Sequence, residues 1–218
     1  MSFAGIGTAV AIAILTAALT GYVLHRVMHS ERFPVLSRAH MIRHFELYGP
    51  AQSMRSAVYR RATDGRGSLG NIGMEWVVPS AITLGTCWAV MWALRVAWKY
   101  EVLVLAILLG WPISMFSYLH DRMHLEKFWM ARVPLLKTWF RKARRLHDIH
   151  HRPLNDKGRM NHNYGIGFLF FDRLFGTIAK RHCPLHWHGN HAAERRHLMS
   201  FESDDGLSNF PSGFRILK

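Results

Sequence analysis

Nine histidines form four tight clusters in this chain of 218 residues, and imidazole is the commonest side-chain ligand for metal ions in proteins. Random placement of the 15 histidines would give about one pair spaced four residues apart, whereas the chain has five such pairs. On a helix, positions i, i+3 and i+4 share one face, so each cluster can direct two or three imidazoles to one point. The spacing therefore predicts a polyhistidine site for one or two metal ions. The clustered residues are His25 and His29, His40 and His44, His120 and His124, and His147, His150 and His151.

Three uncharged segments frame these clusters. Residues 3–24, 77–94 and 102–119 carry no charged side chain over 22, 18 and 18 positions. Each segment is long enough to cross a hydrocarbon core of about 30 Å as a helix. We therefore predict an all-α membrane protein with about three spans, at 3–24, 77–97 and 101–119. The alternative, buried core helices of a soluble domain, suits the two shorter segments better than the first.

The basic residues are distributed as in a membrane protein, although a formal charge of +14 could also indicate nucleic-acid binding. Residues 25–76 hold eight Lys and Arg and residues 120–218 hold 18, while residues 77–119 hold only two. The positive-inside rule places both basic blocks in the cytoplasm. This topology brings His25 and His120, at the ends of two spans, to the same face. We expect a helical cytoplasmic cap formed by 25–76 and 120–181, and no nucleic-acid partner.

The segments between the spans are predicted to be helical and interfacial. Residues 37–54 and 125–146 interleave apolar and basic side chains, which is typical of helices that lie along a membrane surface. Pro134 is expected to kink or interrupt the second of them. The glycine-rich residues 63–73 are predicted to form a loop, and the last 17 residues a loosely ordered tail.

Ordered motifs carry a family resemblance. The sequences are HRVMH at 25–29, HMIRH at 40–44, HDRMH at 120–124 and HDIHH at 147–151, followed by NYG at 163–165 and FDRLFGT at 171–177. This succession resembles the fatty acid hydroxylase superfamily of integral membrane di-iron enzymes, which includes sterol desaturases and fatty-acyl hydroxylases. The resemblance covers residues 25–177 and predicts a hydroxylase-like membrane domain over 1–181, with a separate histidine-containing tail over 182–218.

The resemblance also implies the chemistry. Such enzymes hold two irons by histidine and use O2 with two electrons from a separate redox protein, such as a ferredoxin, rubredoxin or cytochrome. They attack an unactivated C–H bond of a lipid-like substrate, such as an acyl chain, sterol or carotenoid, leaving a hydroxyl group or a double bond. The nine clustered histidines are the ligands that the resemblance carries over to this chain. Hydroxylation is the expected reaction, with desaturation and non-catalytic metal binding as alternatives.

One position departs from the family pattern. The second cluster of many members reads H-x-x-H-H, and here Arg43 stands at the fourth position, where a protonated guanidinium cannot ligate a metal. Either water or another side chain replaces that ligand, and His162 is the nearest candidate. A site with a single metal is the third possibility.

Outer residues of the site can also be nominated. Asp121 and Asp148 each follow a predicted ligand, and a carboxylate commonly accepts the second N–H of a metal-bound imidazole. Asp172 is expected to pair with Arg173 near the cap.

The tail holds a further histidine-rich segment. It contains His182, Cys183, His186, His188, His191 and His197. A zinc site there is possible, but the spacing matches no common structural zinc motif, so a solvated and weakly structured tail is expected.

Two other classes of protein compete with an oxygenase. A metal transporter should place its ligands near the middle of the bilayer, whereas these histidines lie at or beyond the span ends. A haem-binding membrane cytochrome needs axial ligands rather than nine histidines.

Overall fold

The fold is all-helical over the residues that the computed structural model describes. These are residues 2–30, 32–33, 36–37, 40–41, 44–45, 74–152, 157–158, 160–180 and 186–196, with only the backbone described for 74–76. The predicted loop at 63–73, most of the predicted interfacial helix at 37–54 and the last 17 residues lie outside this set. The predicted all-α class is therefore confirmed for the described part of the chain.

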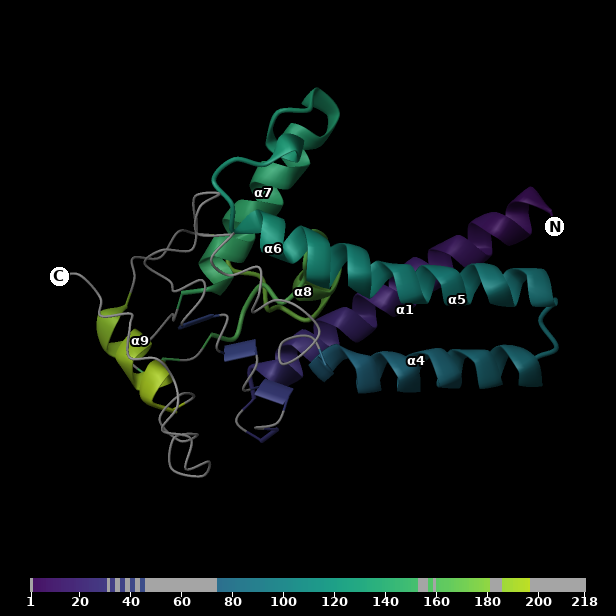
Figure 1. Ribbon diagram of the computed structural model, residues 1–218, viewed down its shortest axis with the longest axis horizontal. Helices are drawn as coiled ribbons and strands as arrows, with labels where there is room; N and C mark the ends of the chain where they lie inside the picture. Colours follow the sequence, from purple (N-terminus) through teal and green to yellow (C-terminus); the bar gives the residue numbers. More distant parts are fainter. Residues whose placement is uncertain are drawn as a thin grey trace.

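Three long apolar helices form the bundle: two of them run side by side, and the first crosses them obliquely (Figure 1). Helix α1 spans Phe3–Met28 and α4 spans Met74–Ala93. Helix α5, Trp98–Pro112, continues without a break through the π-helix η3, Ile113–Leu119, and the short α6, His120–Met123.

Two of these helices are long and apolar enough to cross a membrane. They are Phe3–Met28 and Trp98–Met123, with 26 residues each. The apolar part of α4, Val77–Ala93, is shorter, so the predicted span at 77–97 stays a prediction. The helix ends at Ala93 rather than near 97, because the chain turns there, with Arg95 at φ 52°.

A row of small residues allows α1 to approach α5 closely. Ala9, Ala13, Ala17 and Gly21 recur at every fourth position and are the buried face of the helix at membrane depth. Val104 and Leu108 of α5 pack against the three alanines. Small residues at such spacing let two membrane helices come into backbone proximity.

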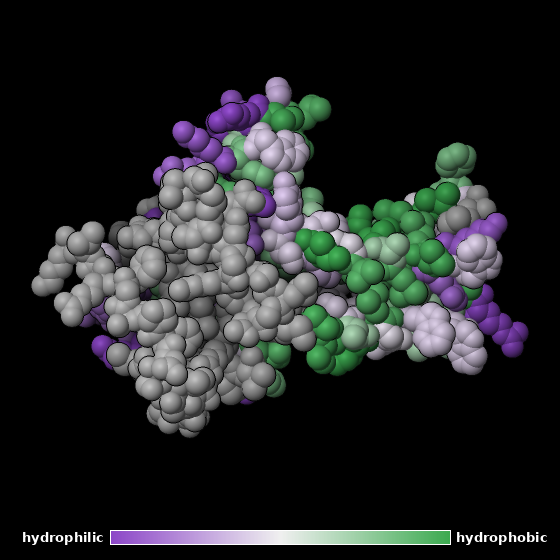
Figure 2. All heavy atoms as spheres, viewed as in Figure 1, coloured by the Kyte–Doolittle hydropathy of each residue, from purple (hydrophilic) through white to green (hydrophobic). Residues whose placement is uncertain are grey.

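The outer faces of the long helices are apolar and exposed. Figure 2 shows hydrophobic side chains gathered over the α4 and α5 half of the molecule. Ile82, Trp92 and Leu109 are each more than half exposed there, and Ile12 of α1 is equally exposed. Apolar surface of this extent on a soluble protein would be an aggregation hazard, whereas lipid tails cover it in a bilayer.

Both ends of the bundle are defined by long-range contacts. At one end, Ser2 N donates to Tyr100 Oη at 3.2 Å, so the chain start lies beside the turn between α4 and α5 (Figure 1). At the other end, the rings of His25 and His120 lie 6.5 Å apart. The expectation that these two histidines share one end of the bundle is therefore confirmed; which side of the membrane that end faces stays a prediction.

A helical layer covers the histidine end. The 3-10 helix η4, Trp129–Ala131, precedes α7, Pro134–His150. Pro134 occupies the first helical position, where its missing N–H costs no hydrogen bond, so α7 begins there and the predicted helix over 125–146 is interrupted at this residue rather than kinked. Phe140 and Ala143 of α7 pack against Phe116 and Leu119 of η3.

Two short helices complete the described chain. Helix α8, Phe170–Leu174, lies against α1, where Phe175 stacks on Tyr22 at 5.3 Å between ring centroids. Helix α9, Trp187–Glu194, lies in the segment expected to be weakly structured. That expectation is wrong for these eight residues, because Ala193 is buried against Met41 and Met160.

Candidate metal centre

The structure brings all nine clustered histidines together at one end of the bundle, in two groups. Within each group, one ring nitrogen from every member lies within 4.8 Å of the others. Eight of the nine side chains are buried, and His29 is partly buried. The five-histidine group contains His25, His29, His40, His44 and His150. The four-histidine group contains His120, His124, His147 and His151.

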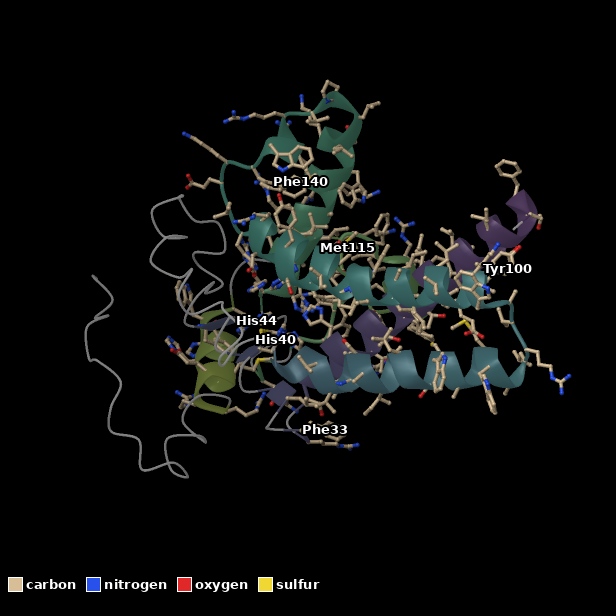
Figure 3. All side chains as sticks on the ribbon, turned by 45° about the vertical axis from the view of Figure 1, so that its right-hand side comes forward. Phe33, His40, His44, Tyr100, Met115 and Phe140 are labelled. Carbon is tan, nitrogen blue, oxygen red and sulfur yellow. The ribbon has the colours of Figure 1, made fainter. Side chains whose placement is uncertain are left out.

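Helix geometry explains the grouping. His25 and His29 end α1, and His120 and His124 end the continuous helix that begins with α5, so each pair projects from the last turn of a long helix. The end of α7 contributes to both groups, because His147 and His151 are one turn apart while His150 is rotated away from them. Figure 3 places His40 and His44 at this end, far from Tyr100 at the other.

Nε2 atoms converge in the five-histidine group. His40 Nε2 lies 3.1 Å from the Nε2 atoms of His25 and His29 and 3.0 Å from that of His44. His29 Nε2 is in turn 3.0 Å from His150 Nε2. A neutral ring nitrogen carries either one hydrogen or one lone pair, so hydrogen bonds cannot satisfy three such neighbours of His40. Imidazoles bound to one ion at about 2.0–2.1 Å, nearly at right angles, place their nitrogens about 3 Å apart. The spacing fits a shared metal ion.

The four-histidine group repeats the pattern. His147 Nε2 lies 3.1 Å from His124 Nε2 and 3.2 Å from His151 Nε2. The ring of His120 lies 4.7 Å from that of His147, measured between centroids.

The two groups are adjacent. The rings of His44 and His151 stack with centroids 4.0 Å apart, and those of His147 and His150 lie 5.5 Å apart. Each of these pairs joins one group to the other, so the two groups that could each hold a metal ion are direct neighbours.

Burial favours the neutral form of four of these imidazoles, which is the form that binds metal. Removal from water lowers the pKa of four of them well below the usual range, and neighbouring histidines lower it further because two imidazolium charges would repel. These four are His44, His147, His150 and His151.

Backbone carbonyls hold two of the rings. His25 Nδ1 lies 2.5 Å from the carbonyl oxygen of Tyr164, and His150 Nδ1 lies 2.6 Å from that of His162. A carbonyl oxygen can only accept, so each Nδ1 donates and each Nε2 presents its lone pair to the group. The sequence identified the histidines but missed both carbonyls; the NYG motif at 163–165 was their only signal.

The three nominated carboxylates have different surroundings. Asp148 pairs with Arg152 at 3.1 Å, and Asp121 lies 3.5 Å from His120 Nδ1, at the limit of a hydrogen bond. Asp172 is fully buried and accepts hydrogen bonds from Tyr164, Gly165 and Thr177. The expected pair of Asp172 with Arg173 is therefore wrong, because the carboxylate binds the NYG segment instead.

His162 does not join either group. Its Nε2 donates to the carbonyl oxygen of Ile149 at 2.9 Å, its backbone oxygen accepts from His150 Nδ1, and its ring meets the His150 ring edge to face at 6.3 Å between centroids. Arg43, whose place it was nominated to fill, lies outside the described residues, as do His182, Cys183 and His197. Among the described residues, the tail histidines form no third group with metal-ligand geometry.

A hollow between the helices leads toward the centre. It is a shallow groove between α1, α4 and α5, and its volume of about 340 Å³ includes space open to the surroundings. Leu24 and Phe116 line its end nearest the histidines, and the Phe116 ring meets His25 edge to face at 6.4 Å. Thr20, Ser80 and Thr83 supply hydroxyl groups to a wall that is otherwise mostly apolar.

Fold and centre together define an all-helical protein with helices long enough to cross a membrane and a buried polyhistidine centre that can bind metal. The family model of the fatty acid hydroxylases matches residues 10–177, about three quarters of the chain. The chain therefore belongs to the fatty acid hydroxylase family, as the motifs predicted. This family consists generally of membrane oxidoreductases that act as hydroxylases or desaturases. Comparison with curated proteins and with solved structures gave no match.

Proposed function

We propose that this protein is a membrane-bound di-iron oxygenase that hydroxylates an unactivated C–H bond of a lipid-like substrate. The observation that carries the proposal is the pair of adjacent all-histidine groups at the end of helices long enough to cross a membrane. Imidazole suits iron in its common oxidation states. When bound, two irons supply reductive activation of O2, and the chain holds them through the nine clustered histidines.

The hollow supports a hydrophobic substrate. An acyl chain, sterol or carotenoid in the bilayer can enter between α1, α4 and α5 without leaving an apolar environment. Leu24 and Phe116 separate the hollow from His25, so these two side chains would contact the part of the substrate nearest the centre. Their role is to exclude water and to orient the C–H bond.

The electron donor is a separate protein in this proposal. The histidine end would face the cytoplasm, and the basic residues of 25–76 and 120–218 would attract an acidic ferredoxin, rubredoxin or cytochrome. Anionic lipid headgroups are the competing partner for the same charges.

Labelled dioxygen tests the reaction. Cells that produce the wild-type protein should accumulate a lipid carrying oxygen from the labelled gas, and cells that produce His124→Ala should not. His191→Ala is the matched control, because His191 is a solvent-facing histidine 3.5 Å from Glu194 and outside both groups. An unlabelled alkene that forms only with O2 present would select desaturation. Lipid extracts identical in all strains would favour non-catalytic metal binding.

A further inference from the structure

One short segment supports histidines from two different helices. The carbonyl oxygens of His162 and Tyr164 accept from His150 of α7 and His25 of α1. Both ligands belong to the five-histidine group. Since a neutral imidazole carries one N–H, fixing it on Nδ1 directs the Nε2 lone pair into the group.

Asp172 fixes the backbone of this segment. Its two carboxylate oxygens accept from Tyr164 N at 2.7 Å, Gly165 N at 2.8 Å and Thr177 Oγ1 at 2.9 Å. Asp172 is 0% exposed, and the backbone N–H of Thr177 also donates to the backbone carbonyl oxygen of Asp172 at 2.8 Å. Glycine at position 165 leaves room for the Asp172 carboxylate. A Cβ there would lie 2.8 Å from Asp172 Oδ2 and would overlap the carbonyl oxygen of Phe168.

Asn163 ties the same segment to α7. Its side-chain amide donates to the carbonyl oxygens of Leu146 and Ala179, both at 2.9 Å, and its side-chain oxygen accepts from Ala179 N at 2.8 Å. The residue has φ 54°, a left-handed conformation that asparagine tolerates better than most residues. The carbonyl groups on either side of Asn163 therefore point at two different helices.

The four-histidine group is supported differently. The Nδ1 atoms of His147 and His151 are buried and make no hydrogen bond within the part of the chain that the structure describes. His120 has Asp121 3.5 Å from its Nδ1. The two carbonyl bonds from the 162–164 segment go only to the five-histidine group.

We infer that Asp172 is a positioning residue for one of the two metal positions, the one held by the five-histidine group. It acts by holding the 162–165 backbone so that two carbonyls orient His25 and His150. The inference rests on the proposed function, in which each group holds one iron.

Asp172→Asn tests the inference. Asparagine has nearly the same shape, but it replaces one acceptor oxygen with an NH2 donor, which would face a backbone N–H. Loss of an outer partner typically weakens metal binding about 10–100-fold. Against a chelator, one iron of Asp172→Asn should therefore leave at about 10–100-fold lower chelator concentration than in the wild type, while the other iron leaves as in the wild type.

Double variants identify which iron is lost. The comparison is made at the chelator concentration that removes one iron from Asp172→Asn. There, adding His150→Ala should cause little further loss of iron, because it affects the same metal position, whereas adding His124→Ala should remove nearly all iron. Asp148→Asn is the matched control, because it makes the same change next to a ligand at a residue paired with Arg152. Its chelator curve should match that of the wild type.

The possible results distinguish a failure of the proposed function from a failure of the inference about Asp172. A wild-type protein with fewer than two irons contradicts the proposed function itself. Two irons in the wild type with an unchanged curve for Asp172→Asn, or equal weakening of both irons, would overturn the inference. If Asp172→Asn does not fold, Thr177→Val removes one donor to the carboxylate and should weaken the same iron; an unchanged curve there would also overturn it.

Discussion

His25 and His150 present Nε2 to the five-histidine group, because backbone carbonyls occupy their Nδ1 atoms. Burial lowers the pKa of His150 and so favours its neutral ring, which is the form that binds metal. Protonation and metal binding therefore compete for the same lone pairs. This competition predicts how the centre responds to acid.

Acid should destabilise the metal-free protein. Burial lowers the pKa of His44 and His151 in the folded state, whereas in the unfolded chain the same residues have the ordinary histidine pKa of about 6.5. Above that pH both states are neutral and the protein has its full stability. As the pH falls below about 6.5 the unfolded chain takes up protons first, so the free energy of unfolding decreases. Thermal unfolding at about pH 7.5 and about pH 5.5 measures the effect. Equal unfolding temperatures at the two values would contradict it.

The sequence predicted which side chains form the site, but it did not predict which backbone groups support them. The i, i+4 spacing identified eight of the nine clustered histidines, and the i, i+3 spacing from His147 added His150, because helical spacing determines which rings share a face. The carbonyls of His162 and Tyr164 could not be predicted, since every residue has a carbonyl and only the left-handed turn at Asn163 aims these two. Adjacency in the sequence suggested an ion pair between Asp172 and Arg173, but it does not show that the fold buries the Asp172 carboxylate against the 164–165 backbone.

Among the elements, the contact between α1 and η3 connects membrane packing to the centre. Gly21 lies one turn before His25, and the Phe116 ring fills the space where its Cβ would be. The same ring contacts His25. A shift of the Phe116 ring should therefore also shift the imidazole of His25, one of the predicted metal ligands.

Gly21→Ala should destabilise the protein and loosen its iron. The added methyl group would overlap the Phe116 ring, and overpacking of this kind costs about 1–3 kcal/mol. Thermal unfolding and the rate of iron loss to a chelator measure the two effects.

Gly7→Ala is the control in the same helix. A Cβ at Gly7 would meet nothing within 4 Å, so this variant should be neutral or slightly more stable, because alanine favours helix. If both variants behave alike, the close contact with Phe116 has no energetic consequence.

Uncharged stretches predicted the positions of the long helices because charge is excluded from spans. They did not predict that the third helix becomes π-helical at Ile113–Leu119 before it presents His120. Pro134 interrupts the predicted 125–146 helix, but the sequence did not show that a new helix starts at this residue, because proline can either break a helix in its interior or begin one at its first position.

At the scale of the whole molecule, the fold separates two ends. Ser2 and Tyr100 meet at one end, and His25 and His120 at the other. Along the sequence, 26 of the 28 Lys and Arg lie in residues 25–76 and 120–218, the segments that begin at His25 and at His120. The positive-inside rule predicts that the histidine end is cytoplasmic.

Topology reporters test this orientation. A reporter fused after Lys218 or inserted within residues 63–73 should be cytoplasmic, and one fused before Ser2 should be outside. Labelling of either basic segment from outside would contradict the orientation.

Salt should slow turnover if an acidic redox protein is the donor. Screening weakens steering between opposite charges, so the apparent KM for the donor should rise with ionic strength while kcat changes little. A rate insensitive to salt in detergent, with the donor supplied, would indicate that the basic residues serve lipid headgroups instead.

The iron content of the purified protein tests the central claim most directly. We predict close to two irons per chain in the wild type and in His191→Ala, and close to one in either His150→Ala or His124→Ala, since each removes a ligand from a different group. A wild type that binds no more than one iron, or two irons retained in both ligand variants, would contradict a centre built from the two histidine groups.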